Sequence, residues 1–136
     1  MKEINDINWL DLLGWTEEEI DDLRFVGYSY IKQGHYETAL KFFEALVVLS
    51  PSSPYDVQIL GAIYLQIGDN LTALSHLDRA INLQADHAPT LLNRAKALLM
   101  LGYNRQGLAQ ALTLSKHEDK SISSQAEALL LAYSQK

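Results

Sequence analysis

The stretch that decides the fold runs from Gly34 to Leu46 and reads GHYETALKFFEAL. Its glycine recurs 34 residues later as Gly68, and after another 34 residues as Gly102. Three other sets of positions keep this interval: Ala39 with Ala73 and Gly107, Gly27 with Gly61 and Ala95, and Tyr30 with Tyr64 and Leu98. Self-similarity at a fixed interval predicts a chain built from repeated structural units that stack on one another.

Glycine and proline mark the helix ends within this pattern. Gly34, Gly68 and Gly102 each follow one run of helical period and precede another, where a residue of positive φ ends an α-helix. The three prolines fall between pairs of such runs, where a fixed φ and a missing N–H stop or start a helix. The periodicity between these breaks predicts helices at residues 17–33, 36–49, 54–67, 70–84, 88–101 and 104–116.

Two further glycines, Gly27 and Gly61, fall inside predicted helices, where glycine costs up to about 1 kcal/mol relative to alanine. Close packing can offset that cost, because a missing side chain lets the next antiparallel helix approach. We expect Ala39 and Ala73 to be the small residues that face these glycines.

Both flanks of the repeats carry helix signals. Ser124 and Glu127 have the spacing of a capping box and predict a closing helix within residues 121–136. At the other end, Thr16 and Glu19 have the same spacing and predict the start of the first repeat helix. The predicted units are an N-terminal apolar helix at 1–15, repeats at about 20–53, 54–87 and 88–120 within residues 16–120, and the closing helix.

The N-terminal segment is too apolar to be left in water. Its large side chains are Trp9, Leu10, Leu12, Leu13 and Trp15. Exposed Trp and Leu side chains seek a partner surface, so we expect this segment to form a homodimer.

Composition narrows the classes of function. The 136 residues carry a net charge of −6, with basic residues scattered along the chain, which disfavours nucleic-acid binding. No cysteine is present, and no two of the histidines His35, His76, His87 and His117 stand three or four residues apart, so we expect no metal site. No apolar run reaches the length of a membrane span, and no catalytic motif is found, so we expect neither a membrane protein nor an enzyme, and no cofactor.

An interval of 34 residues is that of the tetratricopeptide repeat (TPR), and three copies are about the minimum for a stable stack. With the added helices at both ends, the layout resembles the TPR chaperones of bacterial type III secretion. The resemblance rests on Gly34–Leu46 and on Leu60–Tyr64, LGAIY. It implies an all-α fold, a right-handed superhelix of three TPR hairpins with a short N-terminal helix and a C-terminal capping helix.

The resemblance also implies a function. Such chaperones hold an exported subunit, typically a pore-forming translocator, soluble in the bacterial cytoplasm, and often dimerise through their N-terminal helices. The client lies in a concave groove formed by the first helix of each repeat. The groove residues implied for this chain are Arg24, Tyr28, Ile31, Tyr55, Gln58, Ala62, Leu65, Leu92, Lys96 and Leu99.

Three other functions stay open on the sequence. A needle-subunit chaperone of the same secretion system is similarly small, a general TPR scaffold or adaptor has the same repeats, and an enzyme accessory domain could be detached from a larger chain. A TPR cochaperone that grips a C-terminal carboxylate is disfavoured, because the predicted groove offers only Arg24 and Lys96 as cations.

Overall fold

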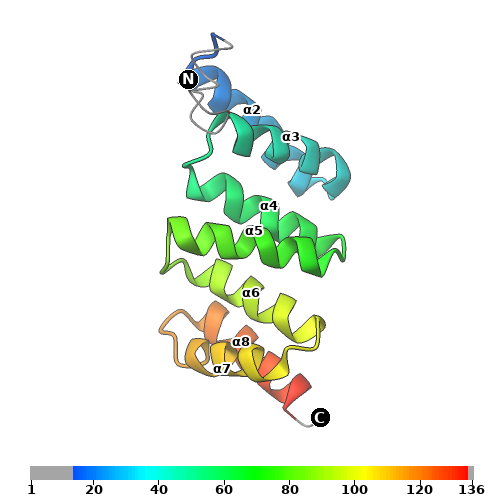
Figure 1. The fold of residues 1–136 in the computed structure, drawn as a ribbon, viewed down its shortest axis with the longest axis vertical. Helices are drawn as coiled ribbons and strands as arrows, with labels where there is room; N and C mark the ends of the chain where they lie inside the picture. Colours follow the sequence, from blue (N-terminus) through cyan, green and yellow to red (C-terminus); the bar gives the residue numbers. More distant parts are fainter. Residues whose placement is uncertain (1–13, 135–136) are drawn as a thin grey trace, which may run out of the picture.

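The computed structural model describes residues 14–134, which are helical with short connections and include no strand (Figure 1). The helices are α2 (Glu17–Lys32), α3 (Tyr36–Leu49), α4 (Pro54–Gln66), α5 (Asn70–Leu83), α6 (Ala88–Met100), α7 (Asn104–Leu114) and α8 (Lys120–Tyr133). The predicted repeat helices match these bounds to within two residues. The all-α prediction is therefore confirmed.

The helices form a stack of hairpins. α2 packs on α3, α4 on α5 and α6 on α7, and each hairpin also packs on the next through the pairs α3·α4 and α5·α6. α8 covers the end of the stack by packing on both α7 and α6. As Figure 1 shows, the first helices of the three hairpins, α2, α4 and α6, run toward the same edge of the molecule, where the hairpin turns lie.

The hairpin turns follow the predicted glycines. Gly34, Gly68 and Gly102 have φ values of 78°, 91° and 93°, which an L side chain rarely adopts. The residue after each glycine donates its N–H back to the helix, as in the bond of 2.9 Å from His35 N to Tyr30 O. This pattern is the Schellman motif, which satisfies carbonyls left unpaired at a helix end.

The helix caps were predicted correctly at one end of the stack and wrongly at the other. Thr16 and Glu19 form the expected capping box, with the Glu19 N–H donating to Thr16 Oγ1 at 3.1 Å. The predicted box at Ser124 and Glu127 is wrong, because α8 begins at Lys120. Its N-cap is Asp119, whose carboxylate accepts from the Ser121 N–H at 2.9 Å, and the upstream acceptor starts the helix before Ser124 is reached.

The two helices of each hairpin approach closely at a glycine. A Cβ atom on Gly27 would lie 2.9 Å from Phe43 Cε2, and one on Gly61 would lie 2.8 Å from Leu77 Cδ2. Close packing was expected here, but with Ala39 and Ala73 as the facing residues. The large side chains one turn further along, Phe43 and Leu77, fill the space instead, and both are fully buried.

The third hairpin makes the same approach with the roles of its helices exchanged. There Gly107 of α7 supplies the space, and a Cβ atom on it would lie 2.6 Å from Leu99 Cγ of α6. Each hairpin thus depends on one absent side chain at the helix crossing.

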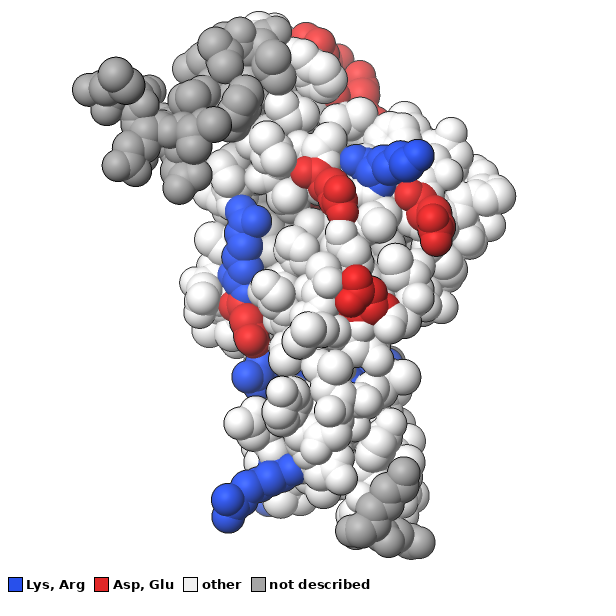
Figure 2. All heavy atoms as spheres, turned by 45° about the vertical axis from the view of Figure 1, so that its right-hand side comes forward, with Lys and Arg blue, Asp and Glu red and all other residues white. Residues whose placement is uncertain are grey.

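An ion pair joins the first two hairpins across the inner helices. Arg24 of α2 donates Nε and Nη2 to the two carboxylate oxygens of Asp56 on α4, at 2.7 and 2.8 Å, and donates Nη1 to Asp21 at 2.6 Å. Asp56 is fully buried, and its hydrogen bond raises the pKa of Arg24. On the face shown in Figure 2, charged side chains are otherwise scattered among uncharged ones and form no basic patch.

The predicted N-terminal segment lies largely before the start of this range. The N-terminal helix at 1–15 and its side chains Trp9, Leu10, Leu12 and Leu13 lie outside the described residues, except for Gly14 and Trp15. Trp15 is about a third exposed, at 36%. None of the helices within residues 14–134 has both the length and the apolar character needed to cross a bilayer.

The first prediction tests the helix crossing of the second hairpin. Ala73 is fully buried beside Leu77 and Ala97, so Ala73→Leu should lower the free energy of unfolding by about 1–3 kcal/mol through overpacking. Ala45 on α3 is exposed, and Ala45→Leu adds the same atoms without this cost. Urea unfolding followed by circular dichroism measures both, and an equal effect would contradict the packing described here.

The second prediction tests the ion pair between α2 and α4. Asp56→Ala leaves the partly buried Arg24 without its main partner and should cost about 3 kcal/mol. Asp78→Ala, which breaks the more exposed Arg94–Asp78 pair, should cost less than about 1 kcal/mol. Chemical unfolding of the two variants gives the comparison, and a cost at Asp56 no larger than at Asp78 would show that the buried pair is not a structural link.

Candidate functional site

The inner surface of the stack is formed by α2, α4 and α6, and residues 34 apart on these helices occupy equivalent places. One such set is Tyr28, Ala62 and Lys96, and the next set along the same face is Phe25, Ile59 and Asn93. None of these six side chains is buried, in contrast to the fully buried residues that face the second helix of each hairpin. Apolar groups on this face are therefore left uncovered by the rest of residues 14–134.

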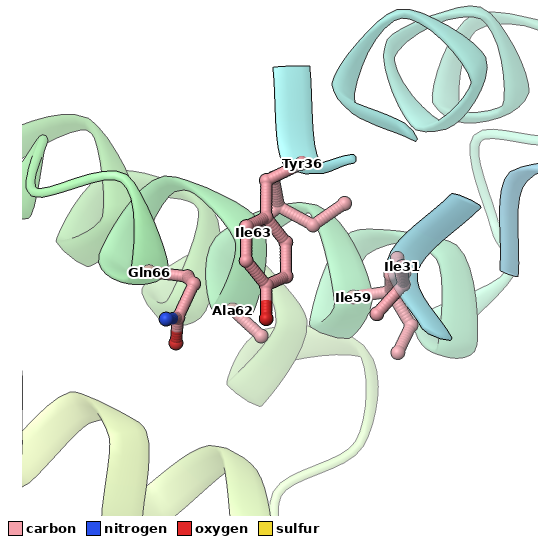
Figure 3. Close-up of a pocket in the computed structure, with 6 residues that line it drawn as sticks. All are labelled: Ile31, Tyr36, Ile59, Ala62, Ile63 and Gln66. Atoms are coloured by element: carbon pink, nitrogen blue, oxygen red, sulfur yellow. The ribbon is translucent and has the colours of Figure 1, made fainter. Parts of the chain in front are cut away.

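A first cavity of about 200 Å³ opens between α2 and α4 (Figure 3). It is lined by Ile31 of α2, Tyr36 of α3, and Ile59, Ala62, Ile63 and Gln66 of α4. Figure 3 shows how these side chains come from three helices to one place. The walls are apolar apart from the Tyr36 hydroxyl and the Gln66 amide, so this cavity suits an aliphatic side chain.

A second cavity of about 300 Å³ adjoins the first. Its lining comes from α2, α4 and the start of α6: Tyr28, Tyr55, Gln58, Ile59, Ala62, His87, Pro89, Thr90 and Asn93. Ile59 and Ala62 line both cavities, which makes the two cavities one continuous groove across α4. We call this surface the inner groove.

The second cavity combines aromatic walls with polar groups. Tyr28 and Tyr55 are 40% and 41% exposed, so both side chains remain accessible to a ligand. Burial, together with nearby Tyr28 and Asp56, raises the pKa of Tyr55. Its hydroxyl, which is protonated at neutral pH as in any tyrosine, can donate a hydrogen bond. His87 and Thr90 contact each other at 2.7 Å between Nδ1 and Oγ1, at the base of α6.

Four of the predicted groove residues line the inner groove: Tyr28, Ile31, Tyr55 and Ala62. Gln58 also lines it, but the side chain is only 8% exposed and donates to Gln84 Oε1 at 3.0 Å. Arg24 lies at the end of the groove, in a shallow depression of about 430 Å³ with Tyr55. Its guanidinium is already occupied by Asp56 and Asp21 and holds the helices together.

Two predicted groove residues, Leu92 and Leu99, are core residues, so their assignment to the groove was wrong. Leu92 is 3% exposed because α8 packs across α6 and brings Ile122 and Ala126 against it. Leu99 is 2% exposed because the absent side chain of Gly107 admits it between α6 and α7.

Two other predicted groove residues line neither cavity of the inner groove. Leu65 is partly buried and packs against the core cluster that contains Ala73, Leu77 and Ala97. Lys96 is partly buried and donates to Gln125 Oε1 of α8 at 3.2 Å.

Sequence reasoning missed several lining residues, chiefly Tyr36, Ile59, Gln66 and Asn93. Helical spacing along the sequence could have identified some of them. Starting from Tyr55, steps of four, three and four residues give Ile59, Ala62 and Gln66, which is one straight face of a helix. A step of four residues from Pro89 gives Asn93.

The inner groove offers apolar and hydrogen-bonding groups to a ligand. Within residues 14–134, no three His, Asp or Glu side chains are placed to hold a metal ion. Apolar cavities joined to amides and hydroxyls can accept the side chains of an extended peptide while hydrogen bonding its backbone.

Comparison with known proteins gives a relative and a family. A family model described as anaphase-promoting complex, cyclosome, subunit 3 matches residues 32–114. Superkiller complex protein 3 of Mus musculus is 32% identical over 77 residues, which are 57% of this chain. The chain spans only 5% of the length of that relative.

Solved structures with low sequence identity share the fold. SycD, a type III secretion translocator chaperone of Yersinia enterocolitica, has a TM-score of 0.78 at 21% identity, covering 93% of this chain and 98% of SycD. PcrH, a Pseudomonas aeruginosa protein solved with the chaperone-binding region of PopD, has a TM-score of 0.79 at 22% identity, covering 90% and 96%. The first TPR of Spaghetti, bound to the HSP90 peptide SRMEEVD, reaches 0.78 at 19%, covering 88% and 94%.

At these identities the solved structures establish a shared TPR fold. The family follows from the sequence itself, because the matching family model covers more than half of the chain. The chain belongs to the family described as anaphase-promoting complex, cyclosome, subunit 3.

Proposed function

We propose that this chain is a chaperone that binds an extended segment of an exported, translocator-like subunit of a bacterial type III secretion system. The observation that carries the proposal is the inner groove, whose two cavities combine apolar walls with amides and hydroxyls and are left open by the rest of residues 14–134. In this function the chain works in the bacterial cytoplasm and keeps its client soluble before export.

The geometry supports an extended client. The two cavities share Ile59 and Ala62, so neighbouring apolar side chains of one strand-like segment can enter both. The Tyr55 hydroxyl and the Asn93 amide lie where they can hydrogen bond a peptide backbone, which gives orientation more than affinity. A convex helix surface would offer no comparable enclosure.

The similar structures support the choice of client class. SycD has been solved with a peptide of the translocator YopD, and PcrH with the chaperone-binding region of PopD. Both resemble this chain over nearly their whole length, which suits a chaperone of the same size. The TPR bound to an HSP90 peptide has a similar score, and it supports the alternative of a general TPR adaptor.

The third prediction tests the groove. Ala62 lies between the two cavities, so Ala62→Glu should weaken client binding by at least about 2 kcal/mol, because a carboxylate there is buried without a partner when the client docks. Melting should change little, since Ala62 is partly exposed in the free protein. Ala45→Glu, on the exposed outer side of α3, is the matched control.

The measurement is capture from the native host with a tagged chain, followed by identification of the retained protein and titration with its binding segment. The proposal expects an exported translocator-like protein, lost with Ala62→Glu and kept with Ala45→Glu. Equal capture by both variants would exclude the inner groove as the client site. Capture of a needle subunit, or of subunits of a static assembly, would favour one of the alternatives.

The fourth prediction concerns the proposed homodimer. If Trp9, Leu10, Leu12, Leu13 and Trp15 form its interface, light scattering should give a dimer for the full chain and a monomer after removal of residues 1–13. Circular dichroism should confirm that the shortened chain is still helical. A full chain that is monomeric at high micromolar concentration would contradict the dimer.

A further inference from the structure

Among the described residues, no acidic side chain lines either cavity of the inner groove, and Glu17 lines only the depression that holds Arg24 at its end. The cavities are bounded by apolar and aromatic side chains, amides, one threonine and His87, with no Asp or Glu. Asp56, on the same helix as much of the lining, is fully buried and bound by Arg24. This is unexpected in a chain whose net charge is −6.

Two lysines stand beside the groove without a carboxylate partner. Lys32 lies one turn beyond Tyr28 on α2, and its Nζ is 5.3 Å from the centre of the Tyr28 ring. Lys96 lies one turn beyond Asn93 on α6, and its Nζ donates to the neutral Gln125. Across the described range, the ion pairs are made by Arg24 and Arg94, so both ammonium charges are uncompensated.

The two lysines lie where their charges can act on a ligand in the groove. Tyr28 and Asn93 are opposite walls of the second cavity, and each carries a lysine one turn further toward the hairpin-turn edge. An apolar segment seated in the groove therefore has an ammonium group on each side of it. Ammonium groups near a low-dielectric surface attract carboxylates more strongly than fully solvated ones do.

We propose that the inner groove selects a client segment in which acidic side chains flank the apolar residues, with one carboxylate pairing with Lys32 and another with Lys96. This inference rests on the proposed function of the groove and adds the chemistry of its ligand. In the stack, α4 lies between α2 and α6 (Figure 1), so Lys32 and Lys96 belong to helices on opposite sides of α4. That separation favours two side-chain carboxylates over one chain terminus held by both lysines.

The fifth prediction is tested with synthetic peptides. Three fluorescein-labelled 14-residue peptides, acetylated and amidated, share two leucines three residues apart and differ only in carrying two Glu, two Gln or two Lys residues around them. Fluorescence anisotropy should show the Glu peptide binding about three- to tenfold tighter than the Gln peptide at low salt, with the Lys peptide weakest. The difference should shrink as salt is raised.

Variants of the lysines test which charges cause the preference for the Glu peptide. The double variant Lys32→Gln, Lys96→Gln should bind the Glu and Gln peptides equally and keep its affinity for the Gln peptide. Lys41→Gln changes an exposed lysine on α3 and should keep the preference for Glu. A fourth peptide with Gln at the flanks and a free C-terminal carboxylate separates the two sources of charge, and tighter binding of it than of the Glu peptide would overturn the side-chain assignment.

The outcomes separate this inference from the proposed function. If all three charge types bind the wild-type chain equally and Ala62→Glu weakens them all, the groove binds peptides but does not select acidic ones. If no peptide binds at any salt concentration, both the selection and the peptide-binding role of the groove are overturned. A preference for Glu that survives in the double lysine variant would place the selecting charge elsewhere.

Discussion

The close approach of two helices at a glycine is the constraint on which the rest of the structure depends. Gly27, Gly61 and Gly107 each leave a space that a large side chain of the facing helix fills. A Cβ atom in that space would push the helices apart, and the hairpins would no longer present matching faces to their neighbours. The direction of the inner helices, and hence the groove between them, follows from these three crossings.

The inner groove results from this packing of the helices. Each first helix uses one face to meet its partner and its neighbours, and the remaining face is left apolar and open at Ile59 and Ala62. The Arg24–Asp56 pair adds a directional link at the point where α2 and α4 meet, because a bidentate guanidinium contact tolerates little rotation. Packing makes the groove, and this pair sets its orientation at the N-terminal end.

The fold could be predicted from the sequence because its signals are local and repeated three times. Glycines 34 residues apart and prolines between helices fix where each helix stops, whatever the side chains do later. The groove residues were harder to predict, because a small rotation of a helix about its axis decides which of its side chains are exposed and which are buried. Leu92 and Leu99 have the right residue type and the right interval, but α8 and Gly107 bury them, and neither contact is visible from the repeat alone. Ile59 was missed because an isoleucine beside core residues in the sequence is usually a core residue itself.

Among the residues that the structure describes, the main contacts join each hairpin to the hairpins before and after it, and the closing helix packs on both helices of the third hairpin. A stack of this kind has no centre that fixes its length. Duplication of residues 54–87 would insert a second copy of the α4–α5 hairpin, and it would add one more inner helix to the groove. The length of the inner surface in such a protein therefore changes in steps of one repeat, and each insertion also changes the cavity at the junction where it enters.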